Sequence, residues 1–332
     1  MPKTFQVAME FRHACKAFDV NKKISDADMR TIFLAARKSP SSFGMEGDLR
    51  AASKIVRISA SLILNQFILY ISLPAMALLQ IPKLSFSYEV IIPVAIAWLV
   101  MGTSALLILA LSRFFAFSRE VTGALLLVGV LGNTSFLGIP VIQAYLGDEA
   151  LGYVLMYDQL GSFIALSTYG TFVSVYYSSA SEVDVKAIAK KILLFPPFLT
   201  LLIALCFIGT EFPPILTGVL GSLAATIVPL ALVAVGLQLR FRLPREELKP
   251  FGVALFTTLL FAPTVAIGLC WVFGWSNLAA NVSVMEAAMG PMITAGAVAS
   301  MSGLAPRLSS SIVGYGTLFS FATTWVVYKL II

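Results

Sequence analysis

From Ser59 to its end, the sequence is a series of apolar segments, and this feature constrains the fold more than any other. Each segment has about the 20 residues that a helix needs to cross a bilayer. Only 12% of all residues are charged, about half the usual fraction in soluble domains. The pattern predicts an all-α, polytopic membrane protein. We count nine predicted membrane spans, at residues 59–79, 88–111, 121–146, 150–176, 192–209, 215–239, 251–273, 278–302 and 309–330.

Basic residues concentrate in alternate connections between these segments. The residues before Ser59 are rich in Lys and Arg, and every second loop after it carries one to four of them. The opposite side carries Lys83, Asp148, Glu149, Glu211 and the terminal Lys329. Cytoplasmic loops carry the excess of Lys and Arg in membrane proteins. We therefore expect a plasma membrane protein (the inner membrane in bacteria) with a cytoplasmic N-terminus and a periplasmic or extracellular C-terminus. The net charge is +6, but the Lys and Arg residues of the spans fall in short loops rather than on one face, so we expect no nucleic-acid partner.

Two predicted spans contain stretches that interrupt a helix. Gly132–Pro140 reads Gly-Asn-Thr-Ser-Phe-Leu-Gly-Ile-Pro, and Met285–Pro291 reads Met-Glu-Ala-Ala-Met-Gly-Pro. Proline removes a backbone donor, and glycine costs a helix about 1 kcal/mol relative to alanine. Lipid tolerates such breaks only where protein or a wet cavity surrounds the freed backbone groups. Two broken helices at matching places in two half-chains are typical of a secondary carrier.

The spacing of prolines reveals an internal repeat. Pro140 follows Pro74 by 66 residues, and Pro291 follows Pro229 by 62 residues. Each pair frames one intact span and ends in a broken one, and the two copies enter the membrane from opposite sides. This is an inverted repeat, most simply derived from five plus five helices with the first helix missing. The predicted transmembrane domain is 58–332, with repeats at 59–177 and 192–332.

Residues from about 60 to 332 resemble the auxin efflux carrier family, in its bacterial form. The matching stretches are Leu64–Pro74, Gly132–Pro140 (Gly-Asn-x-x-Phe-x-Gly-x-Pro), Pro196-Pro197, Pro229–Leu239 and Met285–Pro291. The resemblance implies ten helices divided into a scaffold and a mobile transport domain, with two broken helices that cross near the midplane. It implies transport of a small organic anion, such as a carboxylate or dicarboxylate, by alternating access, and a homodimer as the assembly to test.

The predicted substrate site lies at the two breaks. Backbone amides that begin the second half of a broken helix favour an anion, and we expect these starts near Pro140 and Pro291. Asn133 can bind a carboxylate or the opposing break, while Thr134 and Ser135 add donors. Alternatively, these groups only satisfy the interrupted backbone. The candidate substrate-binding residues are Asn133, Thr134, Ser135, Gly138, Pro140, Glu286, Gly290 and Pro291.

Two acidic residues lie deep within predicted spans, where an ionisable group costs several kcal/mol and suggests a function. Glu286 is a candidate for proton coupling, or a neutral carboxylic acid that fixes the crossing. Asp158 is a candidate for coupling, or a structural hydrogen-bond acceptor for the adjacent broken helix. Sodium, bound by unwound carbonyls, remains an alternative coupling ion. We interpret five aromatic residues as interface anchors or packing: Tyr88, Trp98, Trp271, Trp275 and Trp325.

Residues 1–57 are polar and basic and are predicted to be cytoplasmic. Three stretches, Phe11–Asp19, Ile24–Asp28 and Ser39–Glu46, resemble the N-terminal fragment of a flavin-dependent nitroreductase over residues 1–46. In that family this region helps to hold FMN, but the rest of the nitroreductase core is not in the sequence. We therefore expect no FMN, no other cofactor and no enzymatic activity. Two alternatives to a carrier remain, a membrane-tethered flavin reductase and a truncated, non-transporting remnant.

Overall fold

The computed structural model describes residues 60–61, 63–84, 88–178, 193–238 and 247–331. The chain separates into two units, Met1–Val56 and Arg57–Ile332, and every described residue belongs to the second. The predicted nitroreductase-like fragment lies outside the described residues.

The described part of the chain is helical and contains no strand, which confirms the predicted all-α membrane protein. Four of its helical stretches are long and apolar enough to cross a membrane: Ile63–Lys83, Tyr88–Phe114, Pro214–Gln238 and Leu248–Phe273. The nine-span plan and its inverted repeat remain predictions.

The helices have the following bounds. The first repeat region contains α4 (Leu73–Gln80), α5 (Ile91–Phe114), α6 (Arg119–Val128), α7 (Ile139–Leu146), α8 (Leu151–Leu155) and α9 (Thr171–Tyr177). The second contains α11 (Pro196–Leu205), α12 (Pro214–Ala224), α13 (Ile227–Gln238), α14 (Leu248–Phe256), α15 (Ala262–Phe273), α16 (Leu278–Ala287), α17 (Ile293–Met301) and α18 (Pro306–Ile331). The π-helical turns are η1 (Ile68–Ser72), η4 (Thr134–Gly138), η6 (Met156–Phe163), η7 (Leu166–Gly170) and η9 (Thr257–Phe261), and the short 3-10 turns are η2 (Ile81–Lys83), η3 (Tyr88–Val90) and η5 (Asp148–Ala150).

Polar caps begin the first halves of both broken helices. The Ser118 side chain accepts a hydrogen bond from the Val121 N–H at 3.3 Å and starts α6. The Asn277 side chain accepts one from the Ala280 N–H at 3.0 Å and starts α16. Such caps satisfy amides that have no partner within the helix. The same local device therefore precedes each break.

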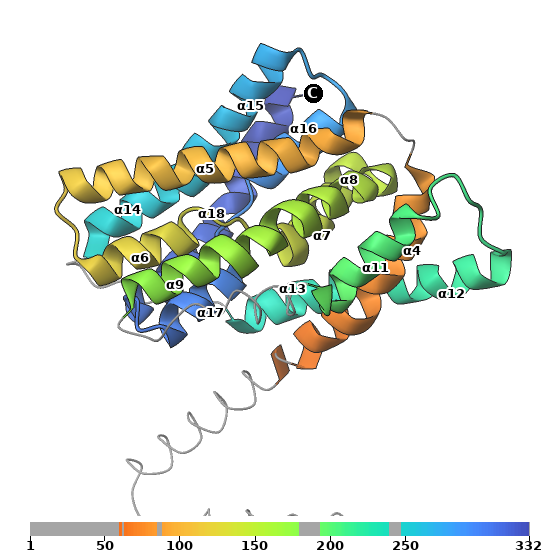
Figure 1. Cartoon of the computed structure of the whole chain (residues 1–332), viewed down its shortest axis with the longest axis horizontal. Coiled ribbons are helices and arrows are strands. Elements are labelled where there is room, and N and C mark those ends of the chain that lie inside the picture. Colours follow the sequence, from red (N-terminus) through yellow and green to blue (C-terminus); the bar gives the residue numbers. More distant parts are fainter. Residues whose placement is uncertain (1–59, 62, 85–87, 179–192, 239–246, 332) are drawn as a thin grey trace, which may run out of the picture. The chain divides into compact units, whose positions relative to one another are not determined.

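The two broken helices exchange partners. α17, the second half of one, packs against α6, the first half of the other, and α16 packs against α7. α5 lies against α6, α16 and η6, and thus spans the crossing (Figure 1). α4 packs against α11 and α12 at the right of Figure 1, and α4 and α11 also contact α8 and η6, respectively. The buried core includes both broken helices and extends over the helices around them.

Candidate functional site

The two unwound segments pair through their backbones. Gly132 and Pro291 form an antiparallel bridge. The Asn133 N–H donates to the Gly290 carbonyl at 2.8 Å, and the Met292 N–H donates to the Leu131 carbonyl at 2.8 Å. Backbone groups at membrane depth require such partners. Each break therefore satisfies donors and acceptors that the other exposes.

The first break lies earlier in the chain than predicted. α6 ends at Val128, the helix resumes at Thr134 as the π-helical turn η4, and Pro140 is the second residue of α7. Proline clashes with the carbonyl of the preceding turn in a regular helix. We attribute the wide turn before Pro140 to this constraint, because a π-turn relaxes that geometry. The second break, between Ala287 and Ile293, lies close to its predicted position.

Asp158 belongs to η6, and its carboxyl lies beside the first residues of η4, where the helix resumes after the first break. Its Oδ1 accepts hydrogen bonds from the hydroxyls of Thr134 at 2.5 Å and Ser135 at 2.6 Å. Its Oδ2 accepts one from the Gln159 amide at 2.5 Å. Carboxyl groups are favourable at helix N-termini because of the helix dipole. In this conformation, the two hydroxyls predicted as substrate donors are bonded to the protein's own acid.

Glu286 lies against the backbone of Gly138. A Cβ atom at Gly138 would lie 2.5 Å from each Glu286 carboxyl oxygen, so only glycine permits this approach. The Glu286 side chain is 1% exposed. Neither of its carboxyl oxygens has a hydrogen-bond partner among the described residues. Gly138 thus accommodates Glu286 one turn into the second half of the first broken helix.

The second break packs tightly on α18. A Cβ atom at Gly290 would lie 2.9 Å from the Ser320 hydroxyl and 3.0 Å from the Thr317 Cα. A Cβ atom at Gly316 would lie 2.5 Å from the Pro291 ring. These glycines bring the two backbones together and hold Gly290 and Pro291 in position for pairing with Gly132 and Asn133.

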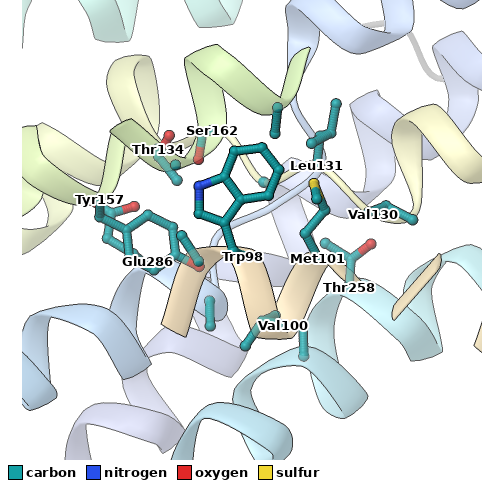
Figure 2. Close-up of a pocket in the computed structure, with 16 residues that line it drawn as sticks. Trp98, Val100, Met101, Val130, Leu131, Thr134, Tyr157, Ser162, Thr258 and Glu286 are labelled. Carbon is teal, nitrogen blue, oxygen red and sulfur yellow. The ribbon is translucent and has the colours of Figure 1, made fainter. Parts of the chain in front are cut away.

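A small cavity lies beside the crossing. Its volume is about 30 Å³, room for roughly one or two water molecules. Figure 2 shows Glu286 and Tyr157 at one side of the cavity, with Thr134 nearby. None of the described residues that line it is Lys, Arg or His. Asn133 lies next to Gly132 and Thr134, which line the cavity, and its buried side-chain amide nitrogen has no described partner.

Trp98 is the site residue that sequence reasoning missed. The sequence analysis interpreted it as an interface anchor or packing. It packs against the core and also lines the cavity, and its indole N–H donates to the Leu160 carbonyl at 3.0 Å. Its place in the middle of the predicted span 88–111 was the available signal, because aromatic interface anchors lie near span ends.

Comparisons with known proteins agree with this architecture. Residues 49–328 match the family described as membrane transport proteins. An uncharacterised transporter of Methanocaldococcus jannaschii is 30% identical, with 78% of this chain and 85% of the relative covered. An uncharacterised transporter of Methanothermobacter thermautotrophicus is 28% identical with the same coverage.

The N-terminal residues match a different class of protein. A putative NAD(P)H nitroreductase of Staphylococcus saprophyticus is 54% identical over 46 residues, which are 14% of this chain and 21% of that relative. The match covers about a fifth of the relative's length, and its 46 residues agree with the predicted resemblance to a nitroreductase fragment.

Proposed function

The chain belongs to the membrane transport protein family, and from this premise we propose that it is a secondary carrier of a small organic carboxylate or dicarboxylate. The membership confirms the resemblance to bacterial auxin efflux carriers and makes the chain a multi-pass membrane protein. In the proposed mechanism, the substrate binds at the crossing and reaches the two sides of the membrane by alternating access.

Two unpartnered polar side chains at the crossing carry this proposal. The Asn133 amide offers a buried N–H donor, and the Glu286 carboxyl offers a buried acceptor, neither with a described partner. A buried polar group left without a partner costs about 1–3 kcal/mol. A substrate carboxylate would supply the acceptor that Asn133 lacks. Gly138, Pro140, Gly290 and Pro291 shape the site, while Thr134 and Ser135 are held by Asp158.

The charges around the crossing favour proton coupling. Glu286 lines the cavity, and no described cationic residue lines it. A second anion beside Glu286 at membrane depth would be unfavourable. A proton bound by Glu286 removes this repulsion, so we propose that Glu286 carries the coupled proton. Asp158 is assigned the structural role of positioning the start of the helix.

Proteoliposomes with purified protein test the proposal. Labelled succinate uptake should follow an imposed proton gradient and should not require sodium. Asn133→Ala should abolish uptake, and Glu286→Gln should abolish its dependence on the proton gradient. Asn281→Ala and Glu89→Gln replace the same residue types away from the crossing and should transport normally. Uptake that is unchanged in both crossing variants would refute the assigned site.

Two further properties belong to the proposal. We propose that the N-terminus faces the cytoplasm and the C-terminus faces outward, which protease access to terminal tags in sealed vesicles tests. We also propose that the protein binds no flavin, so purified protein should be colourless in visible light. Flavin absorbance would favour the tethered-reductase alternative, and colourless protein without flux under any gradient would favour the non-transporting remnant.

A further inference from the structure

We propose that Trp98 occupies part of the substrate's volume in this conformation and sets the largest substrate that the crossing accepts. The inference rests on the proposed carrier function. Trp98 acts here as a specificity-determining residue, whose indole must move before a carboxylate can enter.

The size of the cavity supports this assignment. Its volume of about 30 Å³ is at least tenfold below the roughly 300–1,000 Å³ of typical ligand pockets. Trp98 is the largest side chain that lines it. Figure 2 shows the indole ring across the middle of the site, with Ser162 and Thr134 on one side and Leu131 and Met101 on the other. The ring therefore fills the space in which a substrate would lie.

Several of the residues that line the cavity with Trp98 are small. Gly161, Ala165 and Gly132 line the cavity. A Cβ atom at Gly161 would lie 2.5 Å from the Cβ of Ala97, so η6 and α5 approach closely immediately beside Trp98. This close approach places Trp98, the neighbour of Ala97, beside η6. Movement of the indole, or its truncation, would add the volume of the ring to the cavity.

A single hydrogen bond holds the ring in place. The indole N–H donates to the Leu160 carbonyl at 3.0 Å, and Leu160 belongs to the π-helical turn η6. Turns of this kind occur frequently at functional sites. Rotation of the indole away from Leu160 would free its N–H to donate a hydrogen bond to a substrate carboxylate. Trp98 would then block the site when no substrate is bound and contact the substrate when one is bound.

Substrate size provides the first test. Proteoliposomes would take up succinate, a small dicarboxylate, or 2-naphthoate, a bulky carboxylate. Trp98→Ala should raise the ratio of naphthoate to succinate uptake at least threefold above wild type. Trp98→Phe keeps most of the ring but cannot donate to Leu160, so its ratio should stay nearer to wild type. A change below threefold for Trp98→Ala overturns the inference. Absence of succinate uptake by wild type would instead refute the carrier function.

Fluorescence provides a test that does not require a Trp98 variant to fold. The chain has four tryptophans, so the combined variant Trp271→Phe, Trp275→Phe, Trp325→Phe retains Trp98 as the sole reporter. Saturating succinate should change its emission intensity by at least one fifth. An unchanged emission from protein that still transports succinate overturns the role of Trp98, although the proposed function would stand.

Discussion

Gly138→Ala should separate the stability of this protein from its transport activity. The new Cβ would lie 2.5 Å from both Glu286 carboxyl oxygens and 2.8 Å from the carbon that joins them. These atoms form the end of a flexible side chain beside a cavity of about 30 Å³. The carboxyl group can therefore yield, and the cost of overpacking should fall near the lower end of the usual range, about 1 kcal/mol.

A second effect offsets this cost. Gly138 has helical backbone angles, with φ −59° and ψ −52°, and alanine is favoured over glycine in a helix by about 1 kcal/mol. The net change in the free energy of unfolding should therefore be close to zero. Transport should nevertheless fall about tenfold or more, because the Glu286 carboxyl would leave the position at which the substrate and proton meet. A tenfold loss corresponds to about 1.4 kcal/mol in the transport barrier.

The assay pairs thermal unfolding in detergent with succinate uptake in proteoliposomes. Gly102→Ala, in α5, is the matched control, because a Cβ atom there meets nothing within 4 Å. Glu286→Asp shortens the displaced acid, so adding it to Gly138→Ala should restore stability if any is lost. Normal uptake by Gly138→Ala would refute the role given to Glu286. A destabilisation above about 3 kcal/mol would instead show that the carboxyl group cannot yield.

Two other substitutions should act mainly on stability. Gly316→Ala places a Cβ 2.5 and 2.6 Å from Pro291 ring atoms, and the ring cannot rotate away. We therefore expect about 3 kcal/mol of destabilisation and a clearly lower melting temperature. An unchanged melting temperature would contradict the packing of the second break on α18. Asp158→Asn puts an amide donor opposite the Gln159 amide and should cost about 1–3 kcal/mol, measured by thermal unfolding. Asp148→Asn, at an exposed residue, is the matched control. Loss of proton dependence in folded Asp158→Asn, without loss of stability, would contradict its structural role.

The positions of the breaks were predictable because glycine and proline act locally. Gly132, Pro140 and Pro291 disfavour the interior of a regular helix in any surroundings, because proline lacks the backbone donor and glycine has a low helix propensity. The start of the second half-helix was predicted too late, since hydroxyls at Thr134 and Ser135 gain a partner from a distant residue. Their bonds to Asp158 connect segments that sequence periodicity treats separately. The backbone pairing of Gly132 with Pro291 could not be predicted either, because it forms only when the two broken helices cross.

Trp98 shows a different limit of sequence reasoning. The sequence around an aromatic residue in an apolar span is the same whether the side chain faces lipid, packs in the core or lines a site. Only the arrangement of α5 against η6 decides between these, through the contact of Ala97 with Gly161 and the hydrogen bond to Leu160. Glu286 was easier to identify from the sequence, because an ionisable group at membrane depth is energetically costly and therefore suggests a function.

The position of Glu286 limits how this carrier can work. The substrate carboxylate was expected near the N-terminal end of the second half-helix, and Glu286 itself lies against Gly138 in that region. Two carboxylates about 4 Å apart repel each other by about 4 kcal/mol at an effective dielectric constant of 20, enough to weaken binding roughly a thousandfold. An anionic substrate can therefore bind well only if Glu286 accepts a proton or moves away. Uptake by Glu286→Gln that no longer responds to the proton gradient would support protonation, since the amide is permanently neutral. Loss of both uptake and succinate binding in that variant would instead indicate that the carboxyl group holds the substrate directly.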